Sequence, residues 1–223
     1  MRGAVSIRDN LIAVERRIVG ACVRAGRKRE EVTLVAVSKT KPAEMIDEAI
    51  AAGVTDLGEN RVQEGRDKRP VVRGRARWHL IGHLQSNKAK DAVRLFEVIQ
   101  TVDGVALAEK IARAASSAGK VQDVLLEVNI GNEPQKSGAT PADVAALAKG
   151  VSAFDALRLR GLMAIPPAGE PEETRRWFRE LRAMRDTLGL AELSMGMTDD
   201  FEVAIEEGAT IVRVGRAIFG ERG

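Results

Sequence analysis

A lysine stands at the end of the first long apolar run of the chain. The stretch VTLVAVSKTKP, at 32–42, is almost continuously apolar up to Ser38, and it places Lys39 where a buried strand would end. A desolvated lysine amine has a shifted pKa and can act as a nucleophile toward carbonyl compounds. A single lysine after a strand is more often a solvated loop residue. Lys39 therefore needs partner groups before it indicates chemistry.

Two segments near the C-terminal end could supply such partners. SMGMT at 194–198 and RVGRAIFG at 213–220 each place small residues between an apolar run and the start of a helical stretch. Backbone N–H groups and hydroxyls in such turns can hold a phosphate. Isolated glycines there are more often plain turn formers, and Arg213 could simply close a buried ion pair.

The elements that must position these residues alternate along the chain. A first amphipathic helix is predicted over 6–25, and further helices over 43–52, 105–118, 142–151 and 172–188. Short strand-like runs separate them, and several of these runs are β-branched and apolar on both faces, which is typical of parallel strands covered by helices. The predicted strands are 34–38, 55–58, 78–81, 98–101, 124–129, 160–163, 192–194 and 211–214.

Eight such units after one leading helix predict an α/β fold, a single (β/α)₈ TIM-type barrel over 1–223; an open doubly wound sheet is the alternative. In a barrel, the strand ends meet on one rim, the loops after strands seven and eight commonly bind phosphate, and strand one adjoins strand eight. Lys39 and the two phosphate-type turns would then share one site. A phosphate-bearing aldehyde suits this combination, and pyridoxal 5′-phosphate (PLP) is such a molecule.

The composition makes several other classes of protein poor candidates. The net charge of +3 is small and spread along the chain, and aromatic residues are few, which disfavours nucleic-acid binding. The only cysteine, Cys22, falls on an apolar helical stripe, and with two histidines it makes a poor metal site. The chain contains no membrane-length apolar stretch and no signal-peptide pattern. We therefore expect a cytoplasmic protein with no membrane or metal partner.

Six motifs are familiar as a set. VAVSKTKP, GENRVQE, WHLIGHLQSNK, QKSG, GLMAIPP and the long C-terminal SMGMTDDFEVAIEEGATIVRVGRAIFGER span the chain from its first predicted strand to its last residues. Together they resemble the pyridoxal phosphate homeostasis protein family. Its members are single-domain PLP-binding barrels similar to the N-terminal domain of alanine racemase.

The resemblance implies a role for each matching position. It makes Lys39 the Schiff-base lysine and places Asn60 and His79 near the cofactor ring. Arg213 matches the arginine that faces the pyridine nitrogen. The implied phosphate ligands are the hydroxyl of Thr198 and the backbone N–H groups of Gly215 and Arg216.

The sequence departs from the family pattern at three of its positions. The family often has serine at Thr198, which keeps the hydroxyl, and threonine or serine at Arg216, which here could supply a charged contact instead. It often has proline where His83 stands, so no role carries over to His83.

A lysine-bound PLP could also indicate an enzyme. Racemases of this barrel type need a tyrosine from a C-terminal β domain, and this chain has no tyrosine. An arginine at the pyridine nitrogen also weakens the ring as an electron sink. We therefore expect a non-catalytic PLP carrier that supplies apo PLP-dependent enzymes and is a monomer. A PLP-dependent amino-acid racemase is the alternative, and a Schiff-base aldolase ranks below it because its lysine usually lies on a middle strand.

Overall fold

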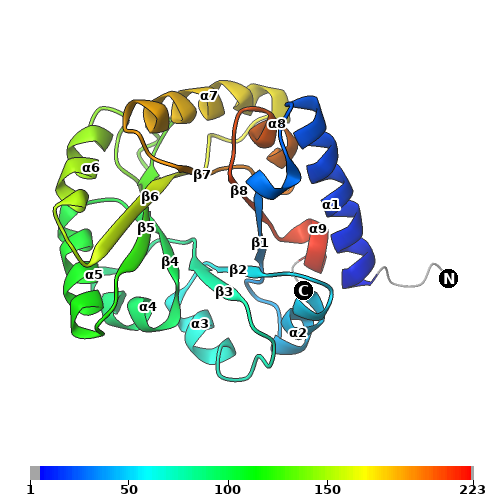
Figure 1. Ribbon diagram of the computed structural model, residues 1–223, viewed down its shortest axis with the longest axis horizontal. Helices are drawn as coiled ribbons and strands as arrows, with labels where there is room; N and C mark the ends of the chain where they lie inside the picture. Colours follow the sequence, from blue (N-terminus) through cyan, green and yellow to red (C-terminus); the bar gives the residue numbers. More distant parts are fainter. Residues whose placement is uncertain (1–5, 222–223) are drawn as a thin grey trace.

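Eight parallel strands form a closed barrel with helices around it (Figure 1). The structure is a computed structural model that describes residues 6–221. The strands are β1 (Thr33–Val37), β2 (Asp56–Glu59), β3 (Arg77–Leu80), β4 (Val98–Val102), β5 (Gln122–Val128), β6 (Leu157–Ala164), β7 (Glu192–Ser194) and β8 (Ile211–Val214). The helices are α1 (Ile7–Arg24), α2 (Ala43–Ala51), α3 (Val62–Lys68), α4 (Ala89–Leu95), α5 (Val105–Ser117), α6 (Val144–Ser152), α7 (Pro171–Thr187), α8 (Phe201–Glu206) and α9 (Arg216–Phe219).

The barrel closes between its first and last strands. Val35 of β1 pairs with Arg213 of β8 on one edge and with Asp56 of β2 on the other. This closure confirms the predicted (β/α)₈ barrel, and the alternative of an open doubly wound sheet is wrong. Because β1 adjoins β8, the segment after Val37 and the segment after Val214 reach the same rim.

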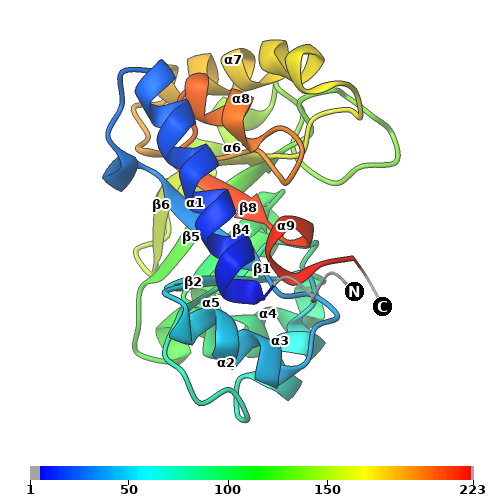
Figure 2. The ribbon, with the colours of Figure 1, turned by 90° about the vertical axis from the view of Figure 1, so that its right-hand side faces the viewer.

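Helix α1 packs against α2, α8 and α9, outside the place where the barrel closes (Figure 2). The helix begins after Ser6, whose hydroxyl accepts the N–H of Asp9 at 3.1 Å. Such a cap satisfies one of the free donors at a helix start. Cys22 lies on the buried face of α1, where burial raises the pKa of its thiol. This position confirms the prediction that Cys22 is a core residue.

The barrel interior holds both apolar and polar side chains. A small apolar cluster consists of Val35, Val98, Leu125, Met163 and Ile211. Buried polar side chains from β2, β3, β4, β7 and β8 occupy other inward positions and belong to the site described below. Within residues 6–221, no helix combines the length and apolar character needed to cross a membrane.

Candidate functional site

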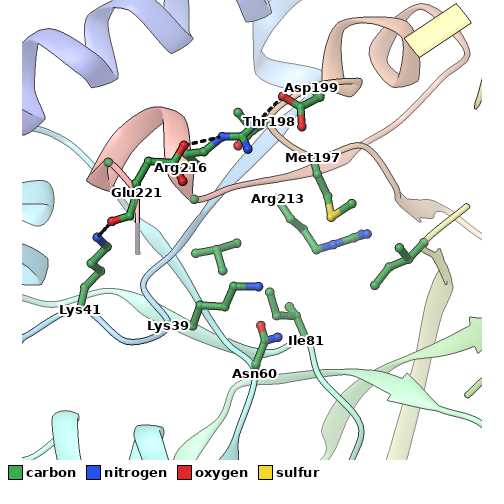
Figure 3. Close-up of a pocket in the computed structure, with 14 residues that line it drawn as sticks. Lys39, Lys41, Asn60, Ile81, Met197, Thr198, Asp199, Arg213, Arg216 and Glu221 are labelled. Atoms are coloured by element: carbon green, nitrogen blue, oxygen red, sulfur yellow. Dashed lines mark hydrogen bonds and ion pairs between the residues drawn. The ribbon is translucent and has the colours of Figure 1, made fainter. Parts of the chain in front are cut away.

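A cavity of about 480 Å³ opens at the C-terminal ends of the strands (Figure 3). Six of the seven positions predicted to bind PLP line it: Lys39, Asn60, Thr198, Arg213, Gly215 and Arg216. With Lys41, the lining includes four cationic side chains against the two carboxylates of Asp199 and Glu221. This excess of positive charge favours an anionic ligand.

Lys39 enters the cavity from the turn that directly follows β1. Its side chain is half-buried, and in Figure 3 it extends toward the same space as the side chain of Arg213. The two residues come from neighbouring strands that lie at opposite ends of the sequence. The closure of the barrel is therefore what brings this amine and this guanidinium into one cavity.

Asn60 reaches the cavity because two loops lie against each other. A side chain at Gly82, just after β3, would place its Cβ 2.2 Å from the carbonyl oxygen of Asn60. Only glycine allows that approach. The hydroxyl of Thr101 donates to the carbonyl of Gly82 at 2.9 Å and ties this loop to β4.

Arg213 is almost fully buried and charged. Burial lowers the pKa of its guanidinium to about 10, opposed by the nearby carboxyl groups of Asp200 and Glu127, so the group is still protonated at neutral pH. One of its nitrogens donates to the carbonyl of Ala164 at 3.0 Å, and another donates to the hydroxyl of Ser194 at 2.7 Å. These bonds fix the direction of the guanidinium.

The support of Arg213 continues through the barrel interior. The hydroxyl of Ser194 donates to Oε1 of Gln100 at 2.6 Å, and Nε2 of Gln100 lies 2.9 Å from Nδ1 of His79. The other ring nitrogen of His79 lies 2.9 Å from a carboxylate oxygen of Asp56. With the amide donating to Nδ1, the Nε2–H donates to Asp56, so the chain of donors ends on a carboxylate.

His79, which the resemblance placed near the cofactor ring, lies deeper in the barrel than the residues that line the cavity. It is 1% exposed and is not among the residues that line the cavity. The reason is that His79 sits deep on β3, where Asp56 and Gln100 hold its ring; Ile81, two residues on, lines the cavity instead. Its link to the site runs through Gln100 and Ser194.

The turns after β7 and β8 form the side of the cavity predicted to bind phosphate. Asp200 accepts the N–H of Met197 at 2.7 Å and so closes the turn that presents Thr198. Gly196 has φ 89°, and a Cβ there would lie 2.5 Å from that of Ala204, so only glycine fits. Arg216 begins α9, and the first N–H groups of a helix have no partner within it.

Charged side chains connect the segments at the mouth of the cavity. Arg216 pairs with Asp199 and Glu221, and the amine of Lys41 donates to the backbone carbonyl of Glu221 (Figure 3). Lys41 thereby links the loop after β1 to the segment that follows α9. His83, for which the resemblance implies no role, is exposed and lies 3.6 Å from Asp103.

A second, smaller cavity of about 130 Å³ lies next to the first, and Ile165 lines both. Lys136 and Glu127 line it, and burial raises the pKa of the Glu127 carboxyl to about 7. The polar strand-end residue Asn129 turns back to its own loop, where its side chain bonds Glu133. Within residues 6–221, no group of three or more His, Cys, Asp or Glu side chains could hold a metal ion.

The sequence reasoning missed four residues that support the site: the buried Asp56, Gln100 and Ser194, and the half-buried Glu127. Each lies at an inward position of its strand, in alternation with residues that face the helices. Polar residues at such positions within apolar strands are the signal that could have identified them.

Comparison with known proteins agrees with this geometry. The chain matches the family described as "Alanine racemase, N-terminal domain" over residues 12–223. The protein is therefore a barrel of this family. The pyridoxal phosphate homeostasis protein of Aquifex aeolicus is 44% identical over 222 residues, which cover 96% of this chain and 97% of that protein. The chain belongs to the pyridoxal phosphate homeostasis protein family.

Two solved structures extend the comparison. PipY of Synechococcus elongatus, solved with PLP bound, is 39% identical with a TM-score of 0.82 over 93% of this chain and 100% of that chain. An alanine racemase of Clostridium difficile is 17% identical with a TM-score of 0.74, over 97% of this chain and 56% of the racemase. At that identity, the second likeness shows the shared fold alone.

Proposed function

We propose that this chain binds PLP through a Schiff base on Lys39 and acts in PLP homeostasis. The observation that carries the proposal is that one cavity combines a lysine amine, a buried guanidinium and two turns suited to phosphate. PLP supplies an aldehyde that condenses with a lysine amine, with loss of one water molecule. The named function of the relatives and the PLP in PipY support the same assignment.

The residues present fit the chemical groups of PLP. The hydroxyl of Thr198 and the N–H groups at the start of α9 are donors for a phosphate. Arg216 is exposed and paired with Asp199 and Glu221, so a phosphate would compete with those carboxylates for its guanidinium. Thr198 and the backbone therefore form the fixed part of the phosphate site, and Arg216 the adjustable part.

Two features favour a carrier over an enzyme: the absence of a tyrosine that could act as the second base of a racemase, and the presence of Arg213. A permanently charged guanidinium that faces the pyridine nitrogen keeps that nitrogen unprotonated, and the ring then stabilises a substrate carbanion poorly. The hydrogen bonds from Arg213 to Ser194 and Ala164 hold the guanidinium in this role. We therefore propose a non-catalytic carrier, a cytoplasmic monomer that supplies PLP to apoenzymes.

The site on Lys39 can be tested directly. The protein is incubated with PLP and reduced with borohydride, and peptide mass spectrometry then locates the pyridoxyl group. We expect the label on Lys39, and we expect Lys39→Ala to abolish both the label and the visible Schiff-base absorption while circular dichroism stays unchanged. Lys41→Ala is the matched control, because Lys41 lines the same cavity two residues away. A label found mainly on Lys41 or Lys136 would contradict the assignment.

A further inference from the structure

The GENRVQE segment at 58–64 contains two carboxylates that the PLP site does not use. Asn60 of this segment lines the cavity, whereas Glu59 and Glu64 are not among the lining residues. Glu59 is fully buried, and Glu64 is partly buried on α3. Both carboxylates face the turn that carries Lys39.

That turn has an unfavourable backbone conformation. The N–H of Lys41 donates to the carbonyl of Ser38 at 3.0 Å, which closes a four-residue turn around Lys39 and Thr40. Thr40 has φ 63°, in the left-handed region that glycine or asparagine normally occupies at this turn position. A β-branched residue is strained there, so surrounding contacts must hold the turn in place.

Lys68 provides these contacts from the last residue of α3. Its amine donates to the carbonyl of Ser38 at 2.8 Å and also contacts Oε2 of Glu64 at 3.1 Å. The same oxygen of Glu64 accepts the N–H of Thr40 at 2.8 Å. The two residues that flank Lys39 are thus both tied to one ammonium–carboxylate pair.

Glu59 completes the arrangement from the end of β2. One of its oxygens accepts the amine of Lys68 at 2.8 Å and the hydroxyl of Ser38 at 2.7 Å. The side chain of Lys68 is 13% exposed and that of Glu59 is 0% exposed, so solvent screens this pair little. Removing Lys68 would leave two carboxylates without their common partner.

We propose that Lys68, together with Glu59 and Glu64, is a positioning residue that holds the strained turn and so keeps the Lys39 amine in the cavity. We call these three residues the Lys68 cluster. When the cluster is broken, the turn relaxes, the amine leaves its position, and PLP is released faster. The effect on PLP rests on the proposed function, whereas the effect on the turn concerns the ligand-free protein.

The test compares Lys68→Met with the wild type in two measurements. In the ligand-free protein, we expect amide hydrogen exchange at Thr40 and Lys41 to become at least about tenfold faster, because one charged hydrogen bond is lost. With PLP, we expect the dissociation constant and the release rate to rise by about tenfold or more. Lys68→Arg keeps the charge and the donors. It should therefore bring amide exchange at the turn and the affinity for PLP part of the way back to the wild-type values.

Lys120→Met is the matched control. Lys120 is also a half-buried lysine that donates to backbone carbonyls, those of Val93 and Phe96, but neither carbonyl belongs to the turn around Lys39. Its loss should lower the melting temperature without changing exchange at Thr40 or the release of PLP. Glu64→Ala serves as a second variant if Lys68→Met fails to fold, because it removes the acceptor for Thr40 on a more exposed side chain.

A double-mutant cycle separates positioning from general destabilisation. Thr40→Gly removes the backbone strain, so Lys68→Met should change PLP binding by a smaller factor in that background. The proposal would be overturned if Lys68→Met changed PLP binding by the same factor with Thr40 and with Thr40→Gly. It would also be overturned if amide exchange at the turn and PLP release stayed unchanged in both Lys68→Met and Glu64→Ala. A wild type that shows no PLP on Lys39 would instead refute the proposed function, while the exchange measurement would still decide the role of the cluster.

Discussion

At the scale of single residues, Thr198 and Arg213 present two kinds of donor to one cavity. Arg213 is buried, charged and held by Ser194 and Ala164, so it cannot follow a ligand that shifts. Thr198 is half-buried in a turn closed by Asp200, and its hydroxyl can rotate toward an acceptor. Loss of the Thr198 hydroxyl should therefore weaken the binding of the phosphate group alone.

We predict that Thr198→Ala weakens PLP binding by about 1–3 kcal/mol, because a charged acceptor loses one of its donors. Binding of pyridoxal, which lacks the phosphate, should be much weaker than that of PLP and should hardly change with this substitution. Absorbance titrations of both ligands with both proteins provide the four affinities. Equal affinity of the wild type for PLP and pyridoxal would refute a phosphate site in these turns.

At the scale of elements, the unit of β2 and α3 buries a carboxyl group behind the site. Burial raises the pKa of Glu59 from 4.5 to about 7, although Lys68 and Ser38 oppose the shift, and Glu64 adds to it. In the folded protein, Glu59 then keeps its proton at pH values at which the same side chain in the unfolded chain has lost it. Because the folded pKa is the higher one, stability from this group is full below pH 4.5 and is lost as pH rises to about 7.

The wild type should therefore lose about 2–3 kcal/mol of unfolding free energy between pH 5 and 7.5 through Glu59. Glu59→Gln should lack this part of the pH dependence, since glutamine does not titrate. Urea unfolding of both proteins at the two pH values measures this change in unfolding free energy. The contribution of Glu127 is the same in both proteins and cancels when the wild type is compared with Glu59→Gln. Parallel pH profiles for the two proteins would show that Glu59 does not titrate in this range.

At the scale of the whole molecule, the open cavity at the barrel rim suits exchange of a ligand with other proteins. We predict that the PLP-loaded protein restores activity to an apo PLP-dependent enzyme in a mixed incubation. Added L-alanine should show no racemisation above background, because the chain has no tyrosine to act as the second base and Arg213 disfavours carbanion formation. Placing a dialysis membrane between the two proteins separates direct transfer from simple release. Robust racemisation, or PLP that no apoenzyme can withdraw, would contradict the carrier role.

The sequence predicted most of the fold because its patterns are local. Short strand-like runs, several of them β-branched and apolar, indicated all eight strands, and the stripe from Ile7 to Cys22 indicated α1. The predicted ends of the strands were less accurate: β6, for example, begins at Leu157 rather than at 160. Residues at strand ends, such as Lys39 and Asn60, could be assigned to the cavity because parallel strands of a barrel share one rim.

What the sequence determined by itself was therefore the order of the eight strands, the family and six residues of the cavity lining. Only the tertiary structure decided which polar residues support them. It placed His79 inside the barrel as part of the chain that holds Arg213, and it brought Lys68 to the turn around Lys39. These contacts join residues 20 or more positions apart, such as His79 with Gln100 and Gln100 with Ser194. Such pairing depends on strand register and barrel closure, which no local pattern encodes.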